Sequence, residues 1–214
     1  MMRKNIGRHK KSSKIQTIIL DNIKSNFNIY IICCIIIILG IIFGVIFINN
    51  LEDNQKVELD EYINSFLINA DSLQIRKTDL LYKTLIKNIV PCILLWLAGI
   101  SIIGLLLDYI LIFYKGFCLG YTISIFVLLF GKVHGMILSF LGLLLQNTII
   151  IPAIFIITSS GMKILKNIVK NSSKETIFFQ YLRHTIVSIL ALAMILCSTF
   201  IEVFFSYEML LRFI

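Results

Sequence analysis

Five long apolar stretches, separated by charged segments, constrain this chain more than any other feature of its sequence. The clearest covers residues 29–48 and contains no charged residue between Lys24 and Glu52. About 20 apolar residues cross the hydrocarbon core of a bilayer as a helix, so this stretch is long enough to span it. The other stretches cover residues 89–113, 116–131, 135–162 and 185–206. The sequence therefore predicts an integral membrane protein.

The composition agrees with this class. Hydrophobic residues make up 58% of the 214 residues, and the mean hydropathy is +0.91, well above the range of water-soluble globular domains. A chain of this length forms one compact bundle of spans and leaves no room for a sizeable soluble domain. The predicted fold is all-α: a polytopic membrane helix bundle with five transmembrane helices, a cytoplasmic amphipathic N-terminal helix and an extracytoplasmic helical segment.

The positions of the basic residues predict the direction of each span. Seven lysines and arginines precede the first span, and a second basic group occupies residues 163–183. Positively charged loops stay in the cytoplasm, so we expect both groups on the cytoplasmic side. Five crossings then place residues 51–88 and the C-terminus outside the cell membrane. They also place Lys115 in a short cytoplasmic turn between the second and third spans.

These features divide the chain into four parts. Residues 1–28 form a basic cytoplasmic arm and an amphipathic surface helix, and residues 29–50 form the first transmembrane helix. Residues 51–88 form an extracytoplasmic amphipathic helical segment, and residues 89–214 form a four-span bundle with a cytoplasmic loop at 163–183. The basic arm carries no aromatic residues among its charges, and such an arm beside a first span is the usual topogenic signal. We therefore expect membrane lipid as its partner and no nucleic acid.

The outer segment contains an amphipathic helix. Its apolar residues recur at intervals of three and four, and most of its charged residues lie on other faces. One interpretation is that the apolar face packs on the bilayer or on the neighbouring helical stretch, as any amphipathic helix must cover this side. The other is that the face docks a partner outside the membrane. The first is the more general expectation; the candidate docking residues are Tyr62, Ile63, Phe66 and Leu67.

Polar residues inside the apolar stretches are candidates for a site within the membrane. Asp108 lies near the predicted cytoplasmic end of the second span, where Lys115 can neutralise it or its side chain can reach the surface. Gln146 and Asn147 lie in the fourth stretch, and Pro152 removes a backbone hydrogen bond nearby. The third stretch has only about 16 residues, which is short for a span.

This pattern has two interpretations. A short span followed by one that amides and a proline interrupt is typical of a broken helix that lines a cavity. Alternatively, the amides bond neighbouring helices together while glycines let those helices approach closely. The second interpretation is favoured, because no charged residue is expected at the middle of the membrane. The candidate close-packing glycines are Gly99, Gly104, Gly116, Gly120 and Gly142.

The sequence shows no pattern of catalytic or metal-binding residues. Its five cysteines all fall in apolar stretches without a C-x-x-C pair, and its three histidines are scattered. No phosphate-binding glycine loop, nucleophile elbow or carboxylate pair with acid–base spacing occurs. His134, in a predicted turn at 131–135, is expected to have a structural or solvated role. We therefore expect no catalytic residue, no metal, no cofactor and no enzymatic activity.

Short motifs spread along the chain resemble a known family. They are GISIIG at 99–104, FYKG at 113–116, GYT at 120–122 and LQNTIIIP at 145–152, preceded by FGVI at 43–46 and an Asn-Asn pair at 49–50. In order and spacing they resemble stage II sporulation protein M of endospore-forming Firmicutes, over essentially the whole chain. Where the family commonly has a proline before the Gln-Asn pair, this chain has Leu145.

The resemblance implies a non-enzymatic membrane scaffold that acts during engulfment in sporulation. Such a scaffold brings two wall hydrolases, a peptidoglycan amidase and a lytic transglycosylase, to the septum. Remodelling of the septal wall then lets the mother-cell membrane move around the forespore. The expected location is the bacterial cell membrane at the sporulation septum of the mother cell. The expected partners are these hydrolases and membrane lipid, with self-association left open.

Two other functions fit the same residues. A permease-like subunit of an ATP-driven transporter would use the segment 163–183 to contact its ATPase. A lipid-handling, scramblase-like protein is a third hypothesis, for which the few polar residues inside the membrane give weak support. The genes beside this one, or the protein that co-purifies with it, distinguish a transporter from a scaffold.

Overall fold

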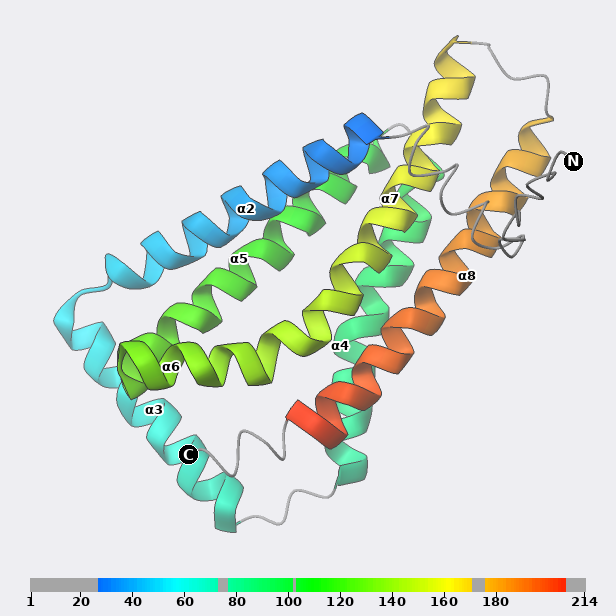
Figure 1. Ribbon diagram of the computed structural model, residues 1–214. Helices are drawn as coiled ribbons and strands as arrows, with labels where there is room; N and C mark the ends of the chain where they lie inside the picture. Colours follow the sequence, from blue (N-terminus) through cyan, green and yellow to red (C-terminus); the bar gives the residue numbers. More distant parts are fainter. Residues whose placement is uncertain (1–26, 73–76, 102, 171–175, 207–214) are drawn as a thin grey trace, which may run out of the picture.

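The chain is helical throughout most of its described part, residues 27–72, 77–101, 103–170 and 176–206 of the computed structural model (Figure 1). In chain order the elements are α2 (Phe27–Asn49), α3 (Asp53–Ser72), α4 (Lys77–Ala98), α5 (Gly104–Phe130), α6 (Lys132–Ser139), the π-helical turn η1 (Phe140–Leu144), α7 (Leu145–Lys170), α8 (Ile177–Ile201) and a second π-helical turn η2 (Glu202–Ser206). The surface helix predicted within residues 1–28 lies almost wholly outside the described residues. For the described part, the predicted all-α class is confirmed.

Five helices are long and apolar enough to cross a membrane, as the sequence predicts. They cover Phe27–Asn49, Asp79–Ala98, Leu106–Phe130, Gln146–Ile168 and Ile177–Phe204. α2, α5 and α8 run in one direction, and α4 and α7 run in the other (Figure 1). At one end of the bundle α2 ends and α3 follows it. α7 is the most enclosed span: 61% of its most apolar part is buried, and the same share is 33% or less in the other four spans.

The boundary between the second and third spans differs from the prediction. We expected a span at 89–113, a turn at Lys115 and a short span at 116–131. This is wrong, because α4 ends at Ala98 and α5 continues as one helix through Lys115. The chain turns before Gly104 instead. The residues of this turn are as apolar as those of the helices, so hydropathy does not reveal it. Lys115 is therefore inside a span and not in a cytoplasmic loop.

Two glycines and a serine form this turn. Ser101 Oγ accepts a hydrogen bond from the Gly104 backbone N–H at 2.9 Å, where α5 begins. Gly104 has no space for a side chain, because a Cβ would overlap the backbone of Ala98. Gly99 lies against Gly161 of α7, whose Cβ, if it had one, would be 2.7 Å from the Gly99 Cα atom. Gly99 therefore packs closely against another helix, as predicted, whereas the close contact of Gly104 lies within the turn itself.

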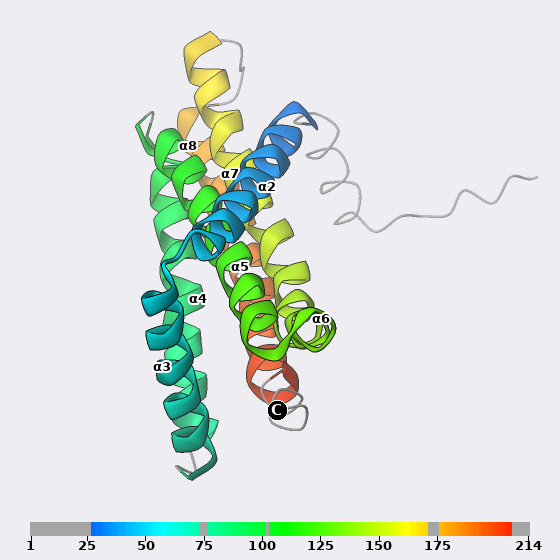
Figure 2. The same ribbon diagram turned by 90° about the vertical axis from the view of Figure 1, so that its left-hand side faces the viewer.

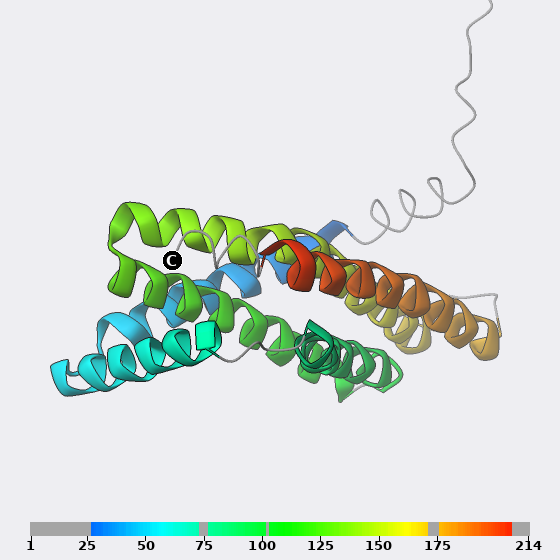
Figure 3. The ribbon, with the colours of Figure 1, turned by 90° about the horizontal axis from the view of Figure 1, so that it is seen from below.

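A tight hairpin joins α5 to α6. Gly131 has φ of 79°, a left-handed conformation that glycine adopts without strain, and its carbonyl accepts the Gly135 N–H at 2.8 Å. A Cβ on Gly135 would overlap the carbonyl of Phe126, so α6 packs closely against the end of α5 (Figure 3). The chain then continues from α6 through η1 into α7. The interruption of this helix is therefore the π-helical turn η1, and α7 passes through Pro152 without ending.

The segment 163–183, expected as a cytoplasmic loop, is mostly helical. α7 continues to Lys170 and α8 begins at Ile177. A helix extends beyond an apolar stretch at little cost where good helix formers such as Lys and Leu follow. Asn167 Nδ2 also donates to Gln180 Oε1 at 3.1 Å, which ties the two helices together. The change in hydropathy marks the end of the apolar residues, not the end of the helices.

α2 is held to the bundle by close backbone contact with α5. Gly40 and Gly44 of α2 lie against the α5 backbone, and Gly116 and Gly120 of α5 lie against the α2 backbone. A Cβ on any of the four would overlap a carbonyl oxygen of the opposite helix. Two edge-on aromatic pairs flank the glycines, each with ring centroids 5.7 Å apart: Phe43–Phe113 and Phe47–Phe117. Small residues of this kind let membrane helices approach one another closely.

Candidate functional site

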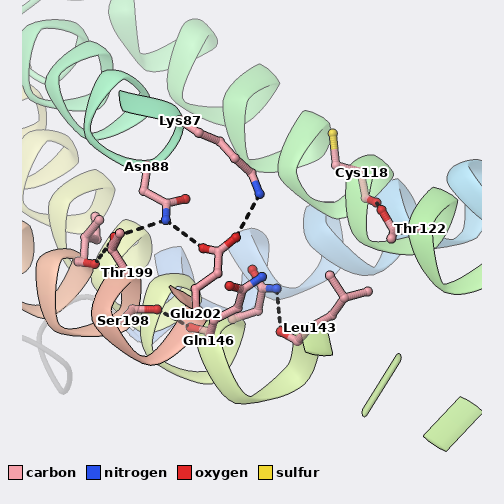
Figure 4. Close-up of polar contacts among 11 residues, drawn as sticks. Lys87, Asn88, Cys118, Thr122, Leu143, Gln146, Ser198, Thr199 and Glu202 are labelled. Atoms are coloured by element: carbon pink, nitrogen blue, oxygen red, sulfur yellow. Dashed lines mark hydrogen bonds and ion pairs between the residues drawn. The ribbon is translucent and has the colours of Figure 1, made fainter. Parts of the chain in front are cut away.

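Polar and charged side chains from α4, α7 and the end of α8 meet between the helices (Figure 4). Glu202 begins η2, directly after the last turn of α8. Lys87 and Asn88 come from α4, and Gln146 comes from the first turn of α7. Charged groups within membrane spans are rare, because each must be removed from water, and they commonly mark functional sites. We call Lys87, Asn88, Gln146 and Glu202 the polar cluster.

The carboxylate of Glu202 is the centre of the polar cluster. Its Oε1 accepts a hydrogen bond from Lys87 Nζ at 3.1 Å, and its Oε2 accepts one from Asn88 Nδ2 at 3.0 Å. The Gln146 amide, assigned with its nitrogen toward the carboxylate, donates to Oε2 at 2.6 Å and to Oε1 at 3.1 Å. Each oxygen therefore has two donors. Pairing and full hydrogen bonding are the conditions under which a carboxylate is stable away from water.

Hydroxyl groups on α8 connect the polar cluster to the backbone. Asn88 Nδ2 also lies 3.2 Å from Thr199 Oγ1, and this hydroxyl donates to the Ile195 carbonyl at 2.9 Å. Ser198 Oγ donates to the backbone carbonyl of Gln146 at 2.9 Å. These bonds join α4 and α7 to α8 at one level of the bundle. The polar cluster is therefore a charged site, and its hydrogen bonds also connect three spans.

Asn147 lies beside the polar cluster, at the junction of η1 and α7. Its Nδ2 donates to the Leu143 carbonyl at 2.7 Å, within the turn where the helix is interrupted. Its side chain is almost fully buried, and its Oδ1 atom has no hydrogen-bond partner among the described residues. A buried amide oxygen without a donor costs free energy, so this atom is an acceptor for a group that approaches it.

A cavity of about 370 Å³ borders the polar cluster. Lys87, Gln146 and Asn147 line it, together with Lys115 from the middle of α5. Its other lining residues are Tyr114, Phe117, Cys118, Leu119, Tyr121, Thr122 and Leu143. Among the described residues, the Lys115 ammonium makes no hydrogen bond and has no carboxylate within 4 Å. The cavity therefore combines two lysines, two amides and an apolar wall.

The remaining polar residues that the sequence singles out lie apart from this cavity. Asp108 is buried in α5, and its Oδ1 has no partner among the described residues. The expectation that it pairs with Lys115 or reaches the surface is wrong, because the two residues are two turns apart on one helix and Asp108 is 1% exposed. Pro152 is exposed in α7, and His134 is exposed in α6 rather than in a loop.

The candidate docking face lies on α3, which diverges from the bundle (Figure 1) and projects beyond α6 (Figure 2). Tyr62 is 70% exposed and Ile63 is half-buried. Phe66 and Leu67 lie in α3, but their side chains are outside the described part. None of the extensive helix–helix packing found among the described residues involves α3. Of its described side chains, most are exposed.

Sequence reasoning missed three of the four members of the polar cluster. Glu202 could have been found, since it lies in the apolar stretch 185–206 and a carboxylate in a span requires a partner. Lys87 and Asn88 were placed in the outer segment, because the apolar stretch begins only at 89. The sequence does identify Gln146 and Asn147, and the structure brings both to the cavity.

One comparison with known proteins gives a match. The family model described as Stage II sporulation protein M matches residues 33–207 of the chain. No match was found among the curated proteins or among the solved structures. The matched region begins within α2 and extends beyond η2, so it includes α3, the polar cluster and the cavity.

Proposed function

The chain belongs to the stage II sporulation protein M family, and from this premise we propose that it is a non-enzymatic membrane scaffold that recruits wall hydrolases during sporulation. The family and the five apolar helices together indicate a sporulation-related, multi-pass membrane protein. The proposal adds that the bundle anchors an extracytoplasmic docking surface. A peptidoglycan amidase and a lytic transglycosylase bind there and remodel the septal wall, so that the mother-cell membrane can advance around the forespore.

The exposure of α3 is the observation that carries this proposal. An amphipathic helix that belonged to the bundle would be expected to pack its apolar face on the neighbouring helices. α3 instead leaves the bundle, and Tyr62 and Val57 are 70% and 57% exposed. Exposed aromatic residues are frequent anchors of protein–protein contacts. The partners expected here are the wall hydrolases, with a second copy of the chain as a further occupant to test.

The substitution Tyr62→Glu tests the docking face. We expect it to abolish septal localisation of both hydrolases in sporulating cells, because it removes an aromatic anchor worth about 2 kcal/mol and adds a charge to a contact that excludes water. Tyr62 makes no extensive packing contact, so the level of the protein in the membrane should stay normal. The measurement is fluorescence microscopy of labelled hydrolases, with immunoblotting of the membrane fraction.

The matched control is Asn64→Glu, which adds the same charge two positions later in α3, a step of about 200° around a helix of 3.6 residues per turn. It should leave localisation unchanged. Normal recruitment by Tyr62→Glu at wild-type protein levels would remove this face of α3 as the docking site. Equal loss with both substitutions would mean that the charge acts on the helix as a whole.

The proposal requires α3 to lie outside the cell membrane. In a variant whose five native cysteines are replaced, single cysteines at Asp53 and Lys132 should react with a membrane-impermeant maleimide in intact cells. A cysteine at Lys166 should react only after the membrane is opened, because Lys166 lies near the C-terminal end of α7, at the opposite end of the bundle from Asp53 and Lys132. Labelling of position 166 in intact cells would show that the chain has the opposite orientation, with α3 in the cytoplasm.

A permease-like subunit of an ATP-driven transporter is the alternative. Such a subunit needs a segment that couples to its ATPase, and the long cytoplasmic loop expected for this purpose is mostly continuous helix in α7 and α8. The helical ends of α7 and α8 would then have to make that contact. Co-purification of an ATPase with the chain would favour this alternative over the scaffold.

A further inference from the structure

We propose that the cavity beside the polar cluster binds the phosphate of an anionic phospholipid headgroup, with Lys115 as its principal cation. This inference concerns a ligand site that the scaffold role neither requires nor supplies. It rests on the charge balance of the cavity, on the composition of its wall and on one unpartnered amide.

The cavity has an excess of positive charge. Lys87 and Lys115 both line it, and the nearest carboxylate, that of Glu202, is bonded to Lys87, Asn88 and Gln146. Both oxygens of Glu202 are therefore occupied, and Lys115 makes no hydrogen bond among the described residues. Asp108, two turns earlier on α5, does not line the cavity. An ammonium group within a span needs a counter-charge, and a bound anion supplies one.

The wall of the cavity suits an anion that is attached to a hydrocarbon chain. Lys115 lies in the middle third of its span, Leu106–Phe130, so an anion that reaches it must enter a layer that excludes free ions. Phe117, Leu119 and Leu143 give the wall its apolar part. Tyr114, one of its lining residues, is 62% exposed, so the cavity lies near the surface of the bundle. A lipid can therefore insert its headgroup from the side while its chains stay outside.

Asn147 adds a hydrogen-bond requirement. Its side chain lines the cavity, is 1% exposed and has an Oδ1 atom without a donor among the described residues. The amide cannot rotate to satisfy this oxygen without losing the bond from its Nδ2 to the Leu143 carbonyl. A headgroup hydroxyl supplies the missing donor. A phosphate with a neighbouring hydroxyl, as in a glycerol headgroup, therefore matches both Lys115 and Asn147.

Lipid binding to the purified full chain tests the site. Native mass spectrometry in detergent would compare phosphatidylglycerol with phosphatidylcholine of the same acyl chains, and separately with inorganic phosphate. We expect phosphatidylglycerol to bind and phosphatidylcholine to bind at least tenfold more weakly. Lys115→Gln should weaken the binding of phosphatidylglycerol about tenfold, the effect of losing one charge-assisted hydrogen bond.

Lys132→Gln is the matched control, because it removes the same charge from the exposed start of α6, outside the cavity. It should bind phosphatidylglycerol like the wild type. Equal weakening by both substitutions would mean that the lipid follows overall charge, and this would overturn the proposal. Wild-type affinity in Lys115→Gln, or equal binding of both lipids, would overturn it too.

Two further measurements keep the outcome decisive. If inorganic phosphate competes with phosphatidylglycerol at similar concentrations, the anion site stands but its ligand is free phosphate rather than lipid. If Lys115→Gln does not fold, Lys115→Met takes its place, because it removes the same charge and its side chain suits an apolar span. That variant should also lose affinity for phosphatidylglycerol, and unchanged affinity in it would contradict the site.

Discussion

The substitution Glu202→Leu should lower the free energy of unfolding by about 2–5 kcal/mol, because it leaves two buried amides without their acceptor and each unsatisfied buried group costs about 1–3 kcal/mol. It leaves Lys87 without its counter-charge and leaves the amides of Asn88 and Gln146 without their acceptor. Leucine has a similar length and is apolar, so it should cause no steric clash. The loss of stability should come from the polar groups that are left without a partner. The measurement is unfolding in mixed micelles with increasing sodium dodecyl sulfate, followed by circular dichroism.

A double substitution separates the ion pair from the position. Lys87→Met combined with Glu202→Leu removes both charges, so it should cost clearly less than Glu202→Leu alone. If the double variant is less stable by the sum of the two single effects, the two residues do not interact. Surface changes usually alter the free energy of unfolding by no more than about 0.5 kcal/mol. If Glu202→Leu falls within this range, the polar cluster does not stabilise the contact between its three spans.

The substitution Gly120→Leu should have the second largest effect, a loss of about 2–3 kcal/mol through overpacking. A Cβ at this position overlaps the Ile41 carbonyl, and backbone cannot move aside as a flexible side chain can. α2 should then separate from α5, because Gly40, Gly44 and Gly116 hold the same contact. The loss can be measured in the same detergent titration, and a cysteine pair across the two helices would report their separation.

Ala193→Leu is the control for added volume. Ala193 is exposed on α8, so a leucine there adds the same apolar bulk toward lipid and should leave the stability nearly unchanged. Equal losses in the two variants would mean that α8 tolerates volume as poorly as the α2–α5 contact. No loss in Gly120→Leu would mean that the close approach of α2 and α5 does not stabilise the bundle.

The number of spans could be predicted from the sequence, because each span needs about 20 apolar residues to cross the hydrocarbon core of the membrane. The residues at which each helix begins and ends were harder to predict. The turn before Gly104 is as apolar as the helices it joins, and it depends on close glycine contacts and on the hydroxyl of Ser101. The ends of α7 and α8 continue past the apolar residues, because helix formation does not stop where hydropathy changes.

The residues of the candidate site could be predicted only in part, for a different reason. Gln146 and Asn147 are conspicuous as neighbouring amides in an apolar stretch. Glu202 and Lys87 are separated by 115 residues, and their pairing depends on the crossing of α4 and α8. Lys115 was assigned to a turn because a lysine between two apolar stretches usually marks a boundary. Its place in a cavity follows only from the path of α5 as one continuous helix.

Affinity capture of the full chain from sporulating cells tests the scaffold role most directly. The tagged chain, solubilised in mild detergent, should co-purify with a peptidoglycan amidase and a lytic transglycosylase, and the Tyr62→Glu variant should capture neither at equal protein levels. The same capture from vegetative cells gives the background. Recovery of an ATPase in stoichiometric amount, with no wall hydrolase above that background, would contradict the scaffold and favour a transporter.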